Sequence, residues 1–354
     1  MMRPIVRTVL PFALGLTLAA APVAVTAGGP PVTPTDVAAG PTASVVALPG
    51  YQVSVFTMGA SAYKNPDSLV SDGTHVYVGY QNVTAKDGTD NKTSTIAEYT
   101  AQGQLVRTFR VLGHCDGLRY NPVTRQLWAL TDEDGNPHLT TIDPSSGASV
   151  LYRTLPTPHG GGYDDLAFLD GVALIDASNP TLNAAGLNAA PALDTITLSG
   201  GKVTLTPVLM GNASALDTTT QKMVTLNEID PDSLTVDPAG RLVLDNQGGR
   251  ELVFLSHVGT PRQTVTRVPL DTQVDDTIWP SAAQGRLLVA DTTANTVYAL
   301  RTRFATGTPY AATPNDSGVA GFVGTINLSS GTITPVAIGF QAPHGELFLP
   351  DSVR

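Results

Sequence analysis

Acidic side chains recur at a regular interval along this 354-residue chain, each at the start of an apolar stretch. The motifs are PDSL, CDGL, YDDLAF, PDSLTV and VDDTIW, with a degenerate sixth copy in PHGELFL. Their anchor residues are Asp67, Asp116, Asp165, Asp232, Asp276 and His344. Carboxylates that converge on one site repel each other unless they are protonated, hydrogen-bonded or neutralised by a cation. A hard cation such as calcium would suit such a site. The alternative is that each aspartate accepts backbone N–H bonds and fixes a turn.

Three histidines accompany these motifs. His114 lies two residues before Asp116, His159 lies six residues before Asp165, and His344 stands in the sixth motif. If the motifs converge, all three histidines can approach the same face. An imidazole there could bind a transition metal or act as a general base. The alternative for each histidine is a side chain that is simply solvated or hydrogen-bonded.

The interval between the motifs predicts how they are brought together. The anchors are 49, 49, 67, 44 and 68 residues apart, which gives a basic period in the forties with two longer excursions. Repeats of this length are typical of propeller blades. Each repeat holds short runs of Val, Leu, Ile, Thr and aromatic residues between Gly, Asp, Asn and Pro turns, a pattern typical of strands. The sequence therefore predicts an all-β, six-bladed β-propeller of four-stranded antiparallel blades. A β-sandwich, the alternative, would not need an acidic motif at a fixed phase.

The two ends of the repeat region predict how the ring closes. Residues 44–57 have the pattern of a terminal hairpin, and residues 343–351 have the pattern of an inner strand without a hairpin. Together they would complete the sixth blade and remove exposed strand edges. The strand at 286–290 is assigned to the fifth blade because it follows VDDTIW directly. This assignment leaves the second strand of the sixth blade unaccounted for.

The N-terminal residues predict export. Arg3 and Arg7 precede an apolar region and a small-residue cleavage site at residues 25–27, so residues 1–27 are interpreted as a signal peptide. A retained membrane anchor is the alternative, but Pro11 and Pro22 interrupt the segment. Residues 28–43 are rich in Pro and Gly and are predicted to form a disordered linker before a single propeller domain at 44–354. We expect a secreted or periplasmic, monomeric protein without a membrane span after signal cleavage.

The charge of the chain limits its partners. The formal net charge is −10, and loss of Arg3 and Arg7 with the signal peptide would take it to −12. Such a surface repels nucleic acid phosphates and anionic lipids, so a small-molecule or protein ligand is expected instead. Cys115 is the only cysteine, which excludes an intrachain disulfide, and it is expected to be buried.

One repeat carries a resemblance to a known family. The segment DPDSLTVDPAGRLVLDN, residues 230–246, resembles propellers of the NHL-repeat and gluconolactonase/senescence-marker superfamily. In the lactonase branch, the resemblance implies one divalent cation, usually calcium or zinc, held at the channel mouth by a glutamate, two asparagines and an aspartate. Asp232 matches the aspartate of that set, and Asp164 stands in place of one asparagine. Cys115 stands in place of the other, and residues 65–67 show no counterpart of the family's Glu-Gly-Pro segment.

Two main hypotheses of function follow. The first is a secreted binding protein whose ligand site on the loop-rich acidic face contains Asp67, Asp116, Asp165, Asp276, His159 and His344. The alternative is a metal-dependent hydrolase of the lactonase or esterase type, with Asp232 and His114 as catalytic residues and Asp232 and Asp164 as metal ligands. The possible cofactor is one divalent cation such as calcium. A purely structural envelope protein is a third possibility.

Overall fold

The protein is described by a computed structural model that covers residues 44–153, 155–315 and 318–351. These residues belong to one compact unit of the chain, residues 43–354. The predicted signal peptide, residues 1–27, and the predicted linker, residues 28–43, lie outside the described residues. Within the described ranges, no helix has the length and apolar character needed to span a membrane.

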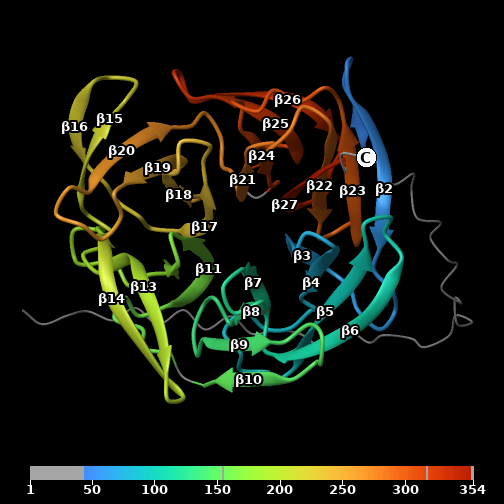
Figure 1. Cartoon of the computed structure of the whole chain (residues 1–354). Coiled ribbons are helices and arrows are strands. Elements are labelled where there is room, and N and C mark those ends of the chain that lie inside the picture. Colours follow the sequence, from blue (N-terminus) through green and yellow to red (C-terminus); the bar gives the residue numbers. More distant parts are fainter. Residues whose placement is uncertain (1–43, 154, 316–317, 352–354) are drawn as a thin grey trace, which may run out of the picture. The chain divides into compact units, whose positions relative to one another are not determined.

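Six sheets, each with an antiparallel core of four strands, are arranged in a ring, and the first strand of each core lies nearest the centre (Figure 1). The described residues form strands, turns and loops, with no helix among them. Around the centre, the first strands contact each other in the order β3, β7, β11, β17, β21, β27 and back to β3. The prediction of an all-β, six-bladed propeller is therefore confirmed.

Blades 1 to 4 follow the repeat in chain order, with each strand hydrogen-bonded to the next. Blade 1 comprises β3 (Pro66–Ser71), β4 (His75–Tyr80), β5 (Thr93–Thr100) and β6 (Leu105–Leu112). Blade 2 comprises β7 (Cys115–Asn121), β8 (Gln126–Thr131), β9 (His138–Ile142) and β10 (Ser149–Tyr152). Blade 3 comprises β11 (Gly162–Leu169), β12 (Val172–Ser178), β13 (Pro191–Ser199) and β14 (Lys202–Met210). Blade 4 comprises β17 (Pro231–Val236), β18 (Leu242–Asn246), β19 (Glu251–Ser256) and β20 (Thr264–Pro269).

Blade 4 is extended at its outer edge by an additional hairpin. This hairpin consists of β15 (Ser214–Asp217) and β16 (Lys222–Thr225), and β15 pairs in parallel with β20. The sheet therefore has six strands. The hairpin accounts for part of the first long excursion in the repeat spacing, because it lies between the third and fourth motifs.

Blades 5 and 6 exchange strands along the chain. Blade 5 comprises β21 (Asp276–Ile278), β24 (Tyr310–Thr313), β25 (Phe322–Asn327) and β26 (Thr332–Ile338). Blade 6 comprises β27 (Pro343–Pro350), β22 (Gly285–Asp291), β23 (Thr296–Arg301) and β2 (Gln52–Met58). The N-terminal strand β2 and the C-terminal strand β27 thus share blade 6, as predicted.

Two details of the predicted closure are wrong. The strand assigned to blade 5 at 286–290 is β22, which pairs with β27 and supplies the missing second strand of blade 6. Residues 44–57 do not form one hairpin, because β1 (Val46–Ala47) pairs with β26 in blade 5 while β2 pairs with β23 in blade 6. The physical reason is that β21 ends after three residues and its pairing partner is β24, so the intervening chain is free to join the next sheet.

The repeated acidic motif coincides with a break in strand register. In blade 1, Pro66 pairs with Tyr80 but Leu69 pairs with Val78, so two residues of β3 lie opposite one residue of β4. Similar shifts interrupt the pairing of the first two strands in blades 2, 3, 4 and 6. A β-bulge of this kind bends the strand and changes the direction of its side chains. The motif residues are the ones that each bulge leaves without a regular partner.

Two motif glycines allow the first strands to approach each other closely. A Cβ atom on Gly117 would lie 2.3 Å from the Asp164 carbonyl oxygen, and one on Gly345 would lie 2.4 Å from the Asp67 carbonyl oxygen. Any side chain at these positions would collide with the backbone of the neighbouring blade. Glycine is therefore required where blade 2 meets blade 3 and where blade 6 meets blade 1.

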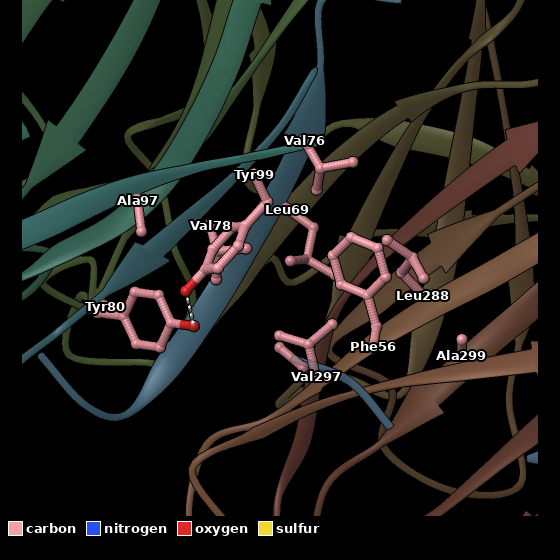
Figure 2. Packing of buried hydrophobic residues seen from close by; sticks show 11 residues of the cluster. Phe56, Leu69, Val76, Val78, Tyr80, Ala97, Tyr99, Leu288, Val297 and Ala299 are labelled. Carbon is pink, nitrogen blue, oxygen red and sulfur yellow. Dashed lines mark hydrogen bonds between the residues drawn. The ribbon is translucent and has the colours of Figure 1, made fainter. Parts of the chain in front are cut away.

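A buried cluster of apolar side chains joins blade 6 to blade 1 (Figure 2). Phe56 of β2 packs with Leu288 and Val297 of blade 6 and with residues of blade 1 such as Leu69. The hydroxyl groups of Tyr80 and Tyr99 lie 2.9 Å apart at one side of this cluster. Apolar packing therefore reinforces the hydrogen bonds that close the ring.

We predict that Phe56→Ala destabilises the propeller by about 3–5 kcal/mol, because it leaves a cavity at the closing joint. Phe56 is 8% exposed, whereas Val55 in the same strand is 53% exposed. Val55→Ala is therefore the matched control, with an expected change within about 0.5 kcal/mol. The measurement is the free energy of unfolding from chemical denaturation. Equal losses in the two variants would contradict the assigned role of the joint.

Candidate functional site

The motif residues form two tiers along the propeller axis. The first motif position of each blade defines the mouth tier, which contains Asp67, Asp116, Asp164, Asp232, Asp275 and His344. The second position defines the inner tier, which contains Ser68, Gly117, Asp165, Ser233, Asp276 and Gly345. Apart from His344, all of these residues line one small cavity of about 30 Å³ together with Arg119. The six motifs therefore meet at one place.

A wider pocket of about 380 Å³ opens above the mouth tier. From the tier it is lined by Asp116, Asp164, Asp232, Asp275 and His344. Polar residues at or beyond the ends of the second strands of several blades add to the wall: Gln81, Lys86, Glu133, Asp134, Ser178, Gln247, Thr292 and Thr293. This pocket is called the mouth pocket below. It provides the loop-rich acidic face that the sequence predicts.

Arg119 separates the acidic end of the axis from an apolar pocket at the other end. That pocket, of about 280 Å³, includes Leu69, Phe168 and Leu234 and also borders Arg119. The Arg119 guanidinium pairs with the Asp165 carboxylate and donates a hydrogen bond of 3.1 Å to the Leu234 carbonyl oxygen. The side chain thus connects blade 2 to blades 3 and 4 across the axis.

The two aspartates of the inner tier hold neighbouring blades together. Asp165 of blade 3 accepts a hydrogen bond of 3.0 Å from the backbone N–H of Leu234 in blade 4. Asp276 of blade 5 accepts one of 2.7 Å from the backbone N–H of Glu346 in blade 6. Asp165 and Asp276 therefore fit the alternative considered for the motif aspartates, in which the carboxylate accepts hydrogen bonds from backbone N–H groups. Asp164 and Asp275, not Asp165 and Asp276, occupy the positions equivalent to Asp67.

The mouth tier concentrates buried carboxyl groups with few cations. Burial raises the pKa of Asp67, and the charges of Asp116 and Asp275 raise it further. Burial likewise raises the pKa values of Asp164 and Asp232, with additional contributions from neighbouring carboxylates. These groups therefore retain protons at pH values where an ordinary aspartate has lost them.

Asp116 behaves differently from its neighbours in the mouth tier. Burial opposes its ionisation, but hydrogen bonds from Asp164 and Glu133 outweigh burial and hold its pKa well below the usual range. Gln81 Nε2 also donates a hydrogen bond of 2.7 Å to Asp116 Oδ1. Asp116 is thus an ionised member of the tier, stabilised by hydrogen bonds from its neighbours.

His344 supplies positive charge to the tier. Its Nδ1 lies 2.7 Å from Asp275 Oδ2 and 3.4 Å from Asp67 Oδ1. Burial disfavours the imidazolium, but the charge and hydrogen bond of Asp275 outweigh it and raise the pKa of His344 to about 10. The sixth motif therefore contributes a cation to a ring of aspartates at neutral pH.

The other two predicted histidines lie in different surroundings. His114 is buried beside Asp116 and Glu133, and potential ligand atoms of the three residues lie within 4.8 Å of one another. His159 Nε2 lies 2.5 Å from the Gly162 carbonyl oxygen, and the ring packs edge-on against Tyr163. Only His114 thus lies in a cluster of possible metal ligands.

Several residues of the pocket were not singled out from the sequence. Glu133 and Lys86 face each other at the mouth as an ion pair. Gln247 Nε2 donates hydrogen bonds of 3.4 Å to Asp232 and 3.2 Å to Asp275. Gln81, Glu133 and Gln247 each lie one or two residues beyond the end of a second strand. These three residues share an equivalent position in the repeat, just after the second strand, although their residue types differ. That shared position is the sequence signal that could have identified them.

Comparisons with known proteins show similarity at the level of fold. No protein-family model and no curated protein matches the chain. A protein of unknown function from Bacteroides caccae is 10% identical over 82% of this chain and 89% of that chain, with a TM-score of 0.47. A periplasmic gluconolactonase from Pseudomonas aeruginosa is 12% identical over 86% and 99%, with a TM-score of 0.46. A candidate 6-phosphogluconolactonase from Bacteroides fragilis is 13% identical over 87% of both chains, with a TM-score of 0.45.

We predict that, without divalent cations, the melting temperature falls as the pH rises from about 5 to 8. Burial raises the pKa values of Asp165 and Asp276 to about 6 and about 7. Between the ordinary value of 3.8 and these values, the native state binds protons that the unfolded state has lost, so stability decreases with rising pH. His344 acts in the same direction, because its stabilisation is complete below pH 6.5 and declines as the pH approaches 10. Thermal unfolding in the presence of a chelator checks this.

The control for this pH dependence is a pair of Asp→Asn variants. Asp276→Asn removes a buried titrating group and should reduce the slope of melting temperature against pH. Asp170→Asn changes an exposed carboxylate in the turn between β11 and β12 and should leave the slope unchanged. A melting temperature that rises across this interval in the original protein would contradict the prediction.

Proposed function

We propose that the protein is a cation-dependent hydrolase of the lactone and ester class that acts in the mouth pocket. The observation that carries the proposal is the cavity below this pocket, where buried carboxyl groups outnumber the cations beside them. Ser233 and Asp165 border the same cavity and are 8% and 5% exposed, respectively. Ser233 Oγ and Asp165 Oδ1 have no hydrogen-bond partner among the described residues.

The residues present fit a divalent cation. The cavity volume of about 30 Å³ exceeds the roughly 10–15 Å³ that a cavity needs to hold one water molecule, so an ion-sized occupant is accommodated. Asp116 and Asp164 come from adjacent blades and hydrogen-bond to each other, which requires a shared proton. A cation held by Asp116 and Asp164 would take the place of that proton. Carboxylate oxygens are the ligands that calcium prefers.

The chain supplies the remaining requirements for hydrolysis. A divalent cation bound here would polarise a carbonyl oxygen and lower the pKa of a bound water. Asp232 borders both the cavity and the mouth pocket, and burial raises its pKa, so its carboxyl group can hold a proton at pH values where an ordinary aspartate is ionised. We assign proton transfer to Asp232. Lys86 and Gln247 can donate hydrogen bonds to the oxygens of a substrate in the mouth pocket.

The proposed location is outside the cytoplasm. This proposal is supported by the predicted signal peptide at residues 1–27 alone. The substrate is proposed to be a small molecule, in line with the volume of the mouth pocket.

We predict that a chelated sample loses hydrolysis of a panel of lactones and esters, and that calcium or zinc restores it. Asp232→Asn should lower kcat/KM by at least about 100-fold, since general acid–base catalysis typically contributes 10²–10⁴. Asp164→Asn should instead weaken cation binding, measured by calorimetry. The two variants therefore separate proton transfer from cation binding.

Asp170→Asn serves as the surface control and should retain both activity and cation affinity. Activity that persists in the Asp232→Asn variant would contradict the proton-transfer role. Cation binding without turnover of any lactone or ester would contradict the hydrolase proposal and favour the hypothesis of a binding protein.

A further inference from the structure

A second group of potential metal ligands lies on the blade 2 side of the mouth pocket. His114 directly precedes β7, and Glu133 follows the end of β8 by two residues. The backbone N–H of Asp132 donates a hydrogen bond of 2.8 Å to the His114 carbonyl oxygen. In return, the backbone N–H of His114 donates one of 2.8 Å to Asp132 Oδ1. These reciprocal bonds hold the start of β7 and the end of β8 together, so His114 and Glu133 are positioned by the sheet.

Hydrogen bonding fixes which nitrogen of His114 carries the proton. His114 Nδ1 lies 3.0 Å from the Thr84 carbonyl oxygen and 2.9 Å from Thr84 Oγ1. The Thr84 hydroxyl donates its own proton to the Gln81 carbonyl oxygen at 2.7 Å, so it can only accept from the histidine. Both neighbours of Nδ1 are thus acceptors, and Nδ1 must be the donor. In the neutral ring, Nε2 therefore carries a lone pair.

That lone pair has no partner within the described parts of the chain. His114 is 5% exposed, and its Nε2 atom is buried without a hydrogen bond. Two carboxyl groups lie close to the His114 ring, because potential ligand atoms of His114, Asp116 and Glu133 all lie within 4.8 Å of one another. A buried polar atom without a partner is costly. A metal-bound histidine usually donates its other N–H to a backbone carbonyl, which is the arrangement seen at Thr84.

Lys86 already places a positive charge beside this group. Its ammonium group forms an ion pair with Glu133 Oε1. The Lys86 side chain is 61% exposed, whereas that of Glu133 is 6% exposed. The flexible lysine can therefore leave the site while the carboxylate stays in place. The Lys86 ammonium group thus neutralises the Glu133 carboxylate in the place of a metal cation.

We propose that His114 Nε2, Asp116 and Glu133 bind a divalent transition metal such as Zn²⁺, at a site beside the axial cavity. One imidazole and two carboxylates suit zinc and similar ions, whereas calcium prefers oxygen ligands alone. Asp116 and Glu133 also border the mouth pocket, so a fourth coordination position faces solvent. Three protein ligands and an open position are typical of zinc sites that bind water or substrate. This site shares Asp116 with the cation site of the proposed hydrolase, but metal binding by His114 and Glu133 does not require hydrolytic activity.

The test is a titration of the tag-free, chelator-treated full chain with Zn²⁺, followed by calorimetry, and with Co²⁺, followed by its visible absorption. His114→Gln and Glu133→Gln should each lower the Zn²⁺ affinity at least tenfold. His75→Gln is the matched control, since His75 is the first residue of β4 and borders a different pocket, and it should leave the affinity unchanged. Equal Zn²⁺ affinity in the His114→Gln variant and the original protein would overturn the proposal.

The Lys86→Met variant should change the Zn²⁺ affinity in the opposite direction from His114→Gln and Glu133→Gln. Removal of the competing ammonium group should raise the Zn²⁺ affinity, and this variant leaves every proposed ligand intact even if His114→Gln fails to fold. Unchanged or weaker Zn²⁺ binding in Lys86→Met would contradict the role assigned to the ammonium group. Calcium binding that persists in the Glu133→Gln variant, together with lost Zn²⁺ binding, would support separate sites.

Discussion

Repulsion between carboxyl groups on the propeller axis is the constraint that the rest of the site must satisfy. The repetition of six similar blades brings one motif from every blade to the axis. An acidic residue of one motif therefore lies close to the equivalent acidic residues of the other motifs. The structure distributes this charge in three ways. Some carboxyl groups keep their protons, some bind backbone N–H groups of the next blade, and some pair with Arg119 or His344. What remains is a site that attracts positive charge.

The β-bulge links this electrostatic problem to the fold. In blades 1, 2, 3 and 6 the bulge releases two consecutive residues from regular pairing, and these residues occupy two levels along the axis. At the mouth level, Asp116 and Asp164 face the pocket, whereas at the inner level Asp165 braces the first strand of the next blade. One local irregularity thus serves both as a structural joint and as the means of presenting polar groups. Glycine at Gly117 and Gly345 keeps the strands close enough for this joint to form.

Much of this arrangement could be predicted from the sequence, because the motif spacing reflects the blade repeat directly. The fold and the convergence of the motifs follow from that spacing, and the closing of the ring by both chain ends follows from the strand patterns of residues 44–57 and 343–351. The sequence could not distinguish Asp164 from Asp165, because their roles depend on a hydrogen-bond donor in another blade. Nor could it place Glu133 and Lys86 together, since they lie in loops of different blades. The exchange of β22 into blade 6 was also missed, because alternating apolar residues do not specify which neighbouring sheet a strand joins.

The shared construction of blade 6 has a consequence for the order in which the chain can fold. Its four strands come from three distant parts of the chain: residues 52–58, 285–301 and 343–350. The second and third strands of this blade, β22 and β23, precede its first strand, β27, in the chain. Blade 6 can therefore be completed only after residues 343–350 have been synthesised. Contacts between such distant segments form slowly, because the chain must first be ordered over hundreds of residues. The core strands of blades 1 to 4 are joined by short local connections, so these blades can form before the last joint of the ring is made.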